Sequence, residues 1–402
     1  MLTISSLNLP AQIAWTVYTT GNSSLPDNSV RCISFENDST TWIGTDFGLV
    51  KMVNGTITNY NTANSGLTNN TIRSLAIDKN GLKYIGTFVN GLNTFNDTVW
   101  TSYSTTNSPL PDDYVRSINI DTNGTRWIGT TGGLVKLDSL NNWTIYTMWN
   151  SVLGSSNIAA IYIDELSNDK WVGTVNGGCL LIEKDTNLTS FTIQNSGISD
   201  NTILGIDQDA VGNIFMSSPA NGLIVKLNGF GWVTYNTISS SIPTAGLSCV
   251  KLDSIDQPWI GTIDKGLLYK DGSTFLVFDT SNSPLTDINI QCVNIDDQGR
   301  VWIGTQSGGL YILDPSLLTG ISQQPANTNV IVYPNPANDQ LFVAGNNKIN
   351  NVRISDTGGR ILLHQNFGDN KQIDVSSLTG GMYNAVFRLD NGLEVTKIFI
   401  KQ

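Results

Sequence analysis

Histidine is almost missing from this chain of 402 residues, whose single histidine is His364. Residues 1–363 therefore cannot use a Ser–His nucleophile or a histidine metal site. Charge is also scarce, because Asp, Glu, Lys and Arg make up 14% of the residues and the net charge is −11. An acidic chain lacks the basic footprint that nucleic acids require, which excludes a nucleic-acid partner.

Long hydrophobic runs are absent as well. No apolar stretch reaches the ~20 residues of a membrane span, so we expect no transmembrane anchor. The N-terminus, MLTISSLNLPA, lacks a basic start but has an apolar segment that ends at a small residue, Ala11. We interpret residues 1–12 as the remnant of a signal peptide whose true start lies upstream of Met1. The alternative is a short terminal tail.

Cysteine is rare, and four cysteines are too few for a disulfide scaffold. Cys32, Cys249 and Cys292 each lie ten residues before the first residue of a repeated motif described below. The other copies of the repeat carry small residues there: Ser74, Ser117, Ala160 and Gly205. The position therefore requires a small side chain, and we expect neither a metal site nor a cofactor.

The motif RWIGTTGGLVKLD, residues 126–138, has six further variants in the chain. The seven copies have their first aromatic residues at Trp42, Tyr84, Trp127, Trp171, Phe215, Trp259 and Trp302. The steps between these residues are 42, 43, 44, 44, 44 and 43. A fixed period of this length is typical of a repeat architecture.

Each repeat has the pattern of four short strands. In the third repeat, residues 114–121, 125–130, 134–138 and 143–147 alternate apolar and polar residues or are rich in aromatic and β-branched residues. Gly-rich turns separate them. Four strands in about 43 residues, repeated, are typical of a propeller blade.

The outer strands predict how the ring closes. A strand at residues 15–18 precedes the first repeat, whereas the seventh repeat has no outer strand of its own. We predict that residues 14–18 complete the last blade, which leaves no unpaired seam. The expected fold is all-β: a monomeric seven-bladed β-propeller over residues 13–314, closed by the N-terminal outer strand.

The seven copies resemble the two-component regulator propeller family. That family is similar to the periplasmic sensor halves of hybrid two-component receptors for polysaccharide breakdown products. This chain departs from such receptors, because it has one propeller, no membrane span and no kinase. The resemblance therefore implies the fold and leaves the sensor role open.

A different module follows a polar linker at residues 315–329. Residues 330–402 alternate strands with Gly-rich turns, which predicts a small β-sandwich. The segments YPNPAND, DTGGR, LTGGMY and KIFIKQ resemble the C-terminal sorting domain of the type IX secretion system of Bacteroidetes-like bacteria. The matching residues are Tyr333, Pro334, Asn335, Pro336, Gly358, Gly359, Gly380, Gly381, Lys397 and Lys401. The resemblance implies export to the outer surface or the medium, with the type IX machinery and its sorting protease as partners.

The residues that depart from the repeat are the candidates for function. Arg31, Arg73 and Arg116 share one position in three adjacent blades, where the other blades have Ala159, Leu204, Ser248 and Gln291. They hold either loop carbonyls or the acidic and hydroxyl groups of a ligand. Trp149 occupies a loop position that is mostly small or polar in other repeats, and we expect it to be at least partly exposed. The alternative is that its ring folds down over its own blade. Phe88 and Tyr114 belong to the same sector.

We therefore predict a binding protein that recognises a polysaccharide or a surface protein on the propeller face that bears the turns between second and third strands. One alternative is an Asp-dependent glycosidase or lyase. Against it, nearly every Asp sits at a position shared between blades, as expected for a structural residue. The other alternative is an adhesion or structural protein with no small ligand. No catalytic residue is assigned.

Overall fold

The computed structural model describes residues 14–272, 274–318, 330–333, 336–344, 348–356, 360–367, 372–390 and 394–402. The chain divides into two compact units, residues 1–321 and 322–402. The predicted signal-peptide remnant at residues 1–12 lies outside the described residues. Among the described residues, the only helix is a 3-10 turn, η1 (Pro315–Leu317).

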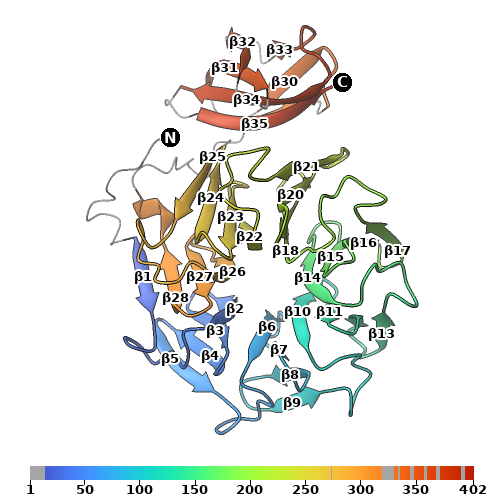
Figure 1. Ribbon diagram of the computed structural model, residues 1–402, viewed down its shortest axis with the longest axis vertical. Coiled ribbons are helices and arrows are strands. Elements are labelled where there is room, and N and C mark those ends of the chain that lie inside the picture. Colours follow the sequence, from blue (N-terminus) through green and yellow to red (C-terminus); the bar gives the residue numbers. More distant parts are fainter. Residues whose placement is uncertain are drawn as a thin grey trace. The chain divides into compact units, whose positions relative to one another are not determined.

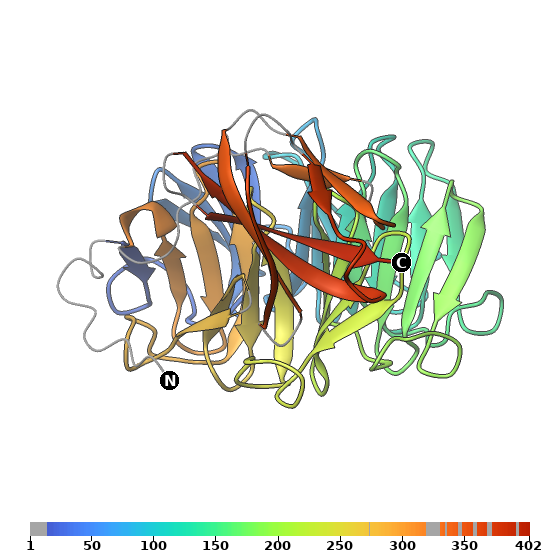
Figure 2. The ribbon, with the colours of Figure 1, turned by 90° about the horizontal axis from the view of Figure 1, so that it is seen from above.

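The first unit is a ring of seven four-stranded antiparallel sheets around a central opening (Figure 1), and Figure 2 shows the same ring edge-on. Blade one contains β2 (Val30–Asn37), β3 (Thr40–Thr45), β4 (Gly48–Val53) and β5 (Thr56–Tyr60). Blade two contains β6 (Ile72–Ile77), β7 (Lys83–Thr87), β8 (Leu92–Phe95) and β9 (Trp100–Tyr103). Blade three contains β10 (Val115–Ile120), β11 (Arg126–Thr130), β12 (Leu134–Leu137) and β13 (Trp143–Tyr146). Blade four contains β14 (Ile158–Ile163), β15 (Lys170–Thr174), β16 (Cys179–Glu183) and β17 (Asn187–Phe191). Blade five contains β18 (Gly205–Gln208), β19 (Ile214–Ser218), β20 (Gly222–Lys226) and β21 (Trp232–Tyr235). Blade six contains β22 (Leu247–Leu252), β23 (Pro258–Thr262), β24 (Leu267–Asp271) and β25 (Thr274–Phe278). The predicted seven-bladed propeller is confirmed.

The seventh blade joins the two ends of the ring. Its sheet contains β26 (Ile290–Ile295), β27 (Val301–Thr305), β28 (Leu310–Leu313) and, as the outer strand, β1 (Trp15–Tyr18). Trp15 pairs with Leu313 and Tyr18 with Leu310. The Trp15 side chain is 8% exposed and its ring lies 6.1 Å from that of Phe278. Closure by the N-terminal outer strand is thus confirmed, and apolar burial stabilises it.

Steric contact explains the glycine of the repeated motif. Gly129 in β11 faces Ser117 in β10 across the strand pair. A Cβ atom added at Gly129 would lie 2.3 Å from Ser117 Oγ and 2.6 Å from Ile158 Cγ2 of the next blade. The Gly and its small partner therefore allow adjacent blades to approach closely. The same pairing joins Cys32 with Gly44, Ser74 with Gly86, Ala160 with Gly173, Cys249 with Gly261 and Cys292 with Gly304.

The fifth blade, whose motif reads FMSS, reverses this pair. Ser217 replaces the motif glycine, and it faces Gly205, which replaces the small partner. A Cβ atom at Gly205 would lie 2.9 Å from Ser217 Oγ. One member of the pair is a glycine in every blade, so the departure in blade five conserves the space between strands.

The recurring acid of the first turn binds the motif tryptophan. Trp127 is fully buried and its Nε1 donates to Asp121 Oδ2 at 3.2 Å. Asp121 Oδ1 also accepts from the backbone N–H groups of Asn123 and Thr125, each at 2.9 Å. A buried indole N–H needs such a partner, so this acid is structural. Equivalent bonds join Trp42 to Glu36, Trp259 to Asp253 and Trp302 to Asp296.

The second unit consists of two small sheets around one apolar core. One sheet has the order β29 (Ile331–Tyr333), β30 (Gln340–Ala344), β33 (Gln372–Asp374), and the other has β32 (Ile361–Asn366), β31 (Ile349–Asp356), β34 (Gly381–Leu389), β35 (Glu394–Lys401). Leu341 and Ile373 of the first sheet share the core with Val352, Phe387 and Phe399 of the second. The β-sandwich prediction is confirmed.

Candidate functional site

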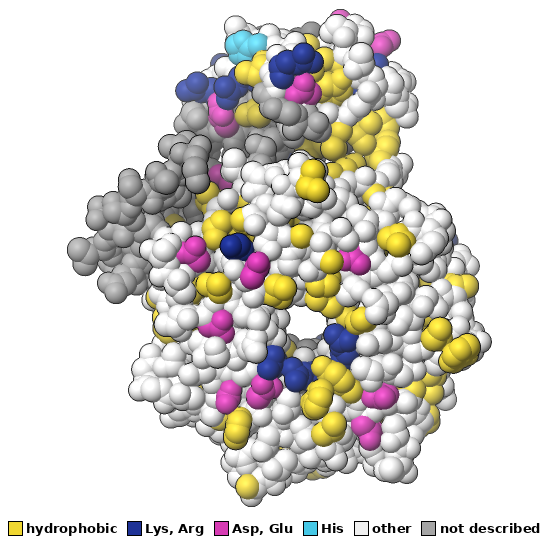
Figure 3. Space-filling view, viewed as in Figure 1, with side chains coloured by type: hydrophobic (Ala, Val, Ile, Leu, Met, Phe, Trp, Pro, Cys, Tyr) yellow, Lys and Arg dark blue, Asp and Glu magenta, His cyan; other side chains and the backbone are white. Residues whose placement is uncertain are grey.

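The inter-blade loops and the turns between second and third strands lie on one face of the propeller. Backbone hydrogen bonds join them: Phe88 N donates to Thr71 O at 3.0 Å, and Thr131 N donates to Tyr114 O at 3.3 Å. We call this the turn face. Lys and Arg side chains gather at one edge of the central opening, over β2, β6 and β10 (Figure 3). The arginines of these three inner strands are Arg31, Arg73 and Arg116.

Arg31 is held by partners within the protein. Its Nη2 lies 2.6 Å from Asp46 Oδ2, and its Nη1 donates to Gln291 Oε1 of the seventh blade at 2.7 Å. Burial works to raise the pKa of Asp46, but hydrogen bonds from Arg31 and Ser29 outweigh it and hold that pKa below its usual value. Arg31 therefore forms a satisfied ion pair at the ring seam.

Arg73 has no such partner. Its Cζ lies 5.1 Å from the ring centre of Phe88 and 5.9 Å from that of Tyr114. Its Nε is buried without a hydrogen-bond partner. Within the part of the chain that the structure describes, no acceptor or carboxylate binds the Arg73 guanidinium. Cation–π contact is thus its main interaction.

Arg116 also lies near the ring of Tyr114. Its Nη1 donates to Asn157 Oδ1 at 2.7 Å, and its Cζ lies 5.7 Å from the Tyr114 ring centre. Partial burial lowers the pKa of Arg116; the nearby Tyr114 opposes this, and the charge of Arg73 lowers it further. Two positive groups therefore share one small region of the turn face.

Phe88 and Tyr114 form the aromatic part of this cluster. Their ring centres lie 4.7 Å apart in an edge-on arrangement, and Phe88 is 42% exposed. The rings come from blades two and three, because Phe88 follows β7 and Tyr114 precedes β10. We call Arg73, Phe88, Tyr114 and Arg116 the rim cluster.

Trp149 lies on the loop between β13 and β14 and is 86% exposed. Its backbone N–H donates to Thr147 Oγ1 at 3.3 Å, which fixes the loop and leaves the ring in solvent. The ring does not fold over its own blade. Trp149 makes no aromatic or cation–π contact with the rim cluster in the described structure, so the structure brings together four of the six predicted residues.

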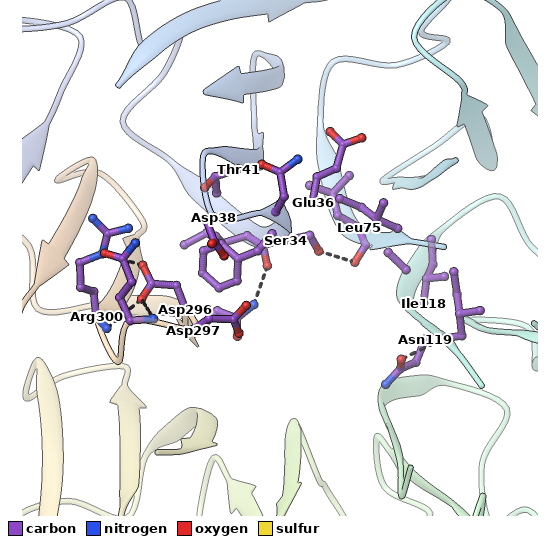
Figure 4. Close-up of a pocket in the computed structure, with 18 of the residues that line it drawn as sticks. Ser34, Glu36, Asp38, Thr41, Leu75, Ile118, Asn119, Asp296, Asp297 and Arg300 are labelled. Atoms are coloured by element: carbon purple, nitrogen blue, oxygen red, sulfur yellow. Dashed lines mark hydrogen bonds and ion pairs between the residues drawn. The ribbon is translucent and has the colours of Figure 1, made fainter. Parts of the chain in front are cut away.

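A cavity of about 580 Å³ opens on inner strands β2, β6, β10 and β26, at their ends away from the rim cluster (Figure 4). Five acids line it: Glu36, Asp38, Glu165, Asp296 and Asp297. Several polar groups of its wall bind the next blade. Ser34 Oγ donates to Leu75 O at 3.1 Å, and Asn294 Nδ2 donates to Ile33 O at 3.0 Å. These bonds connect blades to one another.

Sequence reasoning missed the partners that distinguish the arginines. Asp46 is the residue after the WIGT motif of blade one, and the equivalent residues in blades two and three are Phe88 and Thr131. Comparison of this single position would have shown that only the first arginine has a carboxylate beside it. Gln291 could be predicted as a partner of Arg31 only from the closed ring, because closure brings the last blade next to the first.

The predicted sorting residues lie in the second unit, with Pro334, Asn335, Gly358 and Gly359 outside the described residues. Tyr333 is 50% exposed and stacks on Phe342 at 5.8 Å between ring centres. Gly381 begins β34, preceded by Gly380, and Lys397 pairs with Ala385. Lys401 is buried at 8% exposure, and its Nζ lies 3.7 Å from Asp339. Pro336 precedes an isolated bridge between Ala337 and Lys401.

Two family descriptions match the chain. Residues 331–401 match the secretion system C-terminal sorting domain, and residues 284–307 match the two component regulator propeller. One blade of the propeller thus matches the two component regulator propeller, and nearly the whole second unit matches the type IX sorting domain. This propeller protein is therefore exported to the cell surface or the extracellular space, and its tail interacts with the secretion machinery. No helix among the described residues is long and apolar enough to cross a membrane.

Similar solved structures support the propeller fold. The propeller protein is 19% identical to an extracellular domain ascribed to a hybrid two component system of B. thetaiotaomicron, with a TM-score of 0.67, covering 96% of this chain and 57% of that one. It is 18% identical to PorZ, a surface component of the type IX secretion system of Porphyromonas gingivalis, with a TM-score of 0.62, covering 94% and 60%. The propeller protein thus spans less than two thirds of both.

A third structure matches a smaller share of this chain. It is a histidine-to-alanine variant of virginiamycin B lyase from Staphylococcus aureus, described as catalytically inactive. The identity is 13%, the TM-score is 0.61, and the match covers 74% of this chain and 98% of that one. No curated protein matches the chain. At these identities the likeness shows the fold.

Proposed function

We propose that the turn face of this exported propeller protein binds an extracellular glycan. The observation that carries the proposal is Arg73, whose guanidinium lies over two aromatic rings and has no acceptor among the described residues. A polar group left in this state is costly unless a ligand or water satisfies it. The ring of Phe88, exposed beside it, offers apolar area to the same ligand.

The chemistry of the rim cluster suits a sugar. A sugar ring has apolar faces and a polar edge, which match an aromatic face flanked by hydrogen-bond donors. Arg73 and Arg116 supply the donors, and Phe88 and Tyr114 supply the faces. Trp149 offers a second, separate aromatic face on the next inter-blade loop, which favours an extended chain over a single sugar.

The second candidate is a protein ligand, which the exposed apolar residues of the inter-blade loops favour. Trp149, Ile193 and Ile238 are 86%, 51% and 95% exposed, and they lie on three successive loops. Trp149 and Ile238 share one loop position, which is small or polar in other loops, for example Ala63 and Thr106; Ile193 lies at the position before it. Exposed apolar groups that gather on one face mark interaction surfaces.

The proposal does not include lyase activity, although the fold resembles that of virginiamycin B lyase. The related lyase variant that lost a histidine is described as inactive, and the propeller of this protein contains no histidine. The Asp residues of the first turns are occupied by Trp indole and backbone N–H groups, as in Asp121 and Asp253. Binding of a glycan at the rim cluster requires neither a histidine nor these Asp residues.

We further propose that the sorting protease removes residues 330–402 during export and releases the propeller or fixes it to the surface. The matching sorting domain supports this route. Cleavage would leave the turn face outside the cell, where glycans and surface proteins are available as ligands.

A glycan array probed with the full chain tests the function. We expect binding to a subset of extracellular polysaccharides. Trp149→Ala should weaken binding roughly tenfold, because a stacked aromatic contact contributes about 1–1.5 kcal/mol. The matched control is Leu140→Ala, which removes a side chain that is 81% exposed on the turn between β12 and β13. Absence of any saccharide ligand, or equal effects of both variants, would contradict the proposal.

A further inference from the structure

We propose that the rim cluster recognises a carboxylate, so that the ligand is a uronate-containing polysaccharide. This inference rests on the proposed glycan-binding function and specifies its substrate class. It follows from a comparison of three equivalent arginines, one of which has a carboxylate partner and two of which lack one.

Blade one shows what such an arginine binds when its partner is internal. Arg31 Nε lies 3.1 Å from Asp46 Oδ1, and Arg31 Nη2 lies 2.6 Å from Asp46 Oδ2. The two parallel contacts form the planar pairing that guanidinium and carboxylate groups prefer. The protein itself thus demonstrates carboxylate binding at this position of a blade.

Blades two and three have an arginine at the position of Arg31 but no acid at the position of Asp46. Phe88 and Thr131 occupy the place of Asp46. In the described structure, no Asp or Glu lies within ion-pair distance of Arg73 or Arg116. Arg116 donates a hydrogen bond to a neutral amide, Asn157. Both guanidiniums lie near the Tyr114 ring, at 5.9 and 5.7 Å from its centre, so both can reach one stretch of ligand.

The charge of the whole chain makes this cluster unusual. With a net charge of −11, the protein repels polyanions in general. Residues 1–321 contain five arginines, and three of them are Arg31, Arg73 and Arg116 on neighbouring inner strands. Two positive charges that form no ion pair with a carboxylate in the described structure, beside an exposed aromatic ring, favour an anion on a sugar ring. A neutral glycan would supply no such carboxylate.

Equilibrium binding to polygalacturonate and to its methyl ester tests the inference. The two ligands share a backbone and differ in the charge of the carboxyl group. The full chain should bind the acid at least tenfold more tightly than the ester, and the difference should shrink as salt rises. Arg73→Gln or Arg116→Gln should remove about tenfold in affinity for the acid, as expected for loss of a charged hydrogen bond.

Two matched variants isolate charge from shape. Phe88→Asp restores an internal acid beside Arg73, as in blade one, whereas Phe88→Asn removes the same ring without adding charge. Phe88→Asp should bind polygalacturonate several-fold more weakly than Phe88→Asn. The control is Arg300→Gln, because Arg300 pairs with Asp296 at the acidic cavity and should not affect binding. Thermal unfolding verifies that each variant is folded.

The outcomes separate the two proposals. Binding of a glycan with equal affinity for acid and ester, unaffected by Arg73→Gln, would overturn the carboxylate inference and leave glycan binding intact. Absence of any saccharide binding would overturn both. Polyglutamate that binds through Arg73 and Arg116 more tightly than polygalacturonate would also overturn it, because the ligand would then be an acidic protein.

Discussion

At the residue scale, identical side chains at equivalent positions have different roles because of their neighbours. Arg31 pairs with Asp46, while Arg73 lies over Phe88 and Tyr114 without a carboxylate. Lysines show the same contrast in the wall between blades one and two. Lys83 is completely buried between Glu36 and Asp97, and Lys51 reaches Asp97 from a more exposed position.

These two lysines give a matched prediction about stability. Lys83→Met should lower the free energy of unfolding by about 2–4 kcal/mol, because it removes the buried ion-pair partner of Glu36, whose side chain is 18% exposed. Lys51→Met should cost under about 1 kcal/mol, because that pair is partly solvated and Asp97 keeps Lys83. Urea unfolding of both variants measures the difference. Costs within about 0.5 kcal/mol of each other would disprove the assigned roles.

At the element scale, the spacing of strands and turns along the chain determines where each blade begins and ends, and this spacing is visible in the sequence. Alternating strands, glycine turns and the 42–44-residue period predicted all seven blades, and the unmatched first strand predicted closure of the ring. The surroundings of Arg31 and Arg73 were not predictable from periodicity. They depend on single side chains in turns and, for Gln291, on contact between the first and last blades.

The reversed pair in blade five gives an element-scale prediction. Gly205→Ser should destabilise the propeller by about 1–3 kcal/mol, because the new Cβ would lie 2.9 Å from Ser217 Oγ. Adding Ser217→Gly should restore at least half of that loss, since it recreates the Ser117–Gly129 arrangement of blade three. Thermal unfolding of both variants decides the matter. A double variant no more stable than Gly205→Ser would show that other contacts determine this site.

At the scale of the whole molecule, the chain combines a closed ring with a sorting tail. The ring presents loops and turns from all blades on one face, and the tail matches an export domain. The two units form separate cores, since the tail buries Val352, Phe387 and Phe399 among its own strands. The proposed binding site and the export domain therefore belong to different units.

The tail gives a prediction at this scale. A reporter with a periplasmic signal peptide, fused to residues 321–402, should reach the surface of a host with type IX secretion. The same fusion should remain in the periplasm of a host that lacks the machinery. Protease accessibility on intact cells measures the outcome. Retention of the fusion in both hosts would show that the tail is insufficient for export.

The central claim is that a saccharide binds at the rim cluster on the turn face. Hydrogen–deuterium exchange of the full chain, with and without the best saccharide of the array, tests it most directly. We predict slower exchange in residues 71–74, 87–91 and 112–116, which surround Arg73, Phe88, Tyr114 and Arg116. Exchange in residues 36–41 and 296–300, at the acidic cavity, should stay unchanged. Protection confined to the cavity segments would contradict the account.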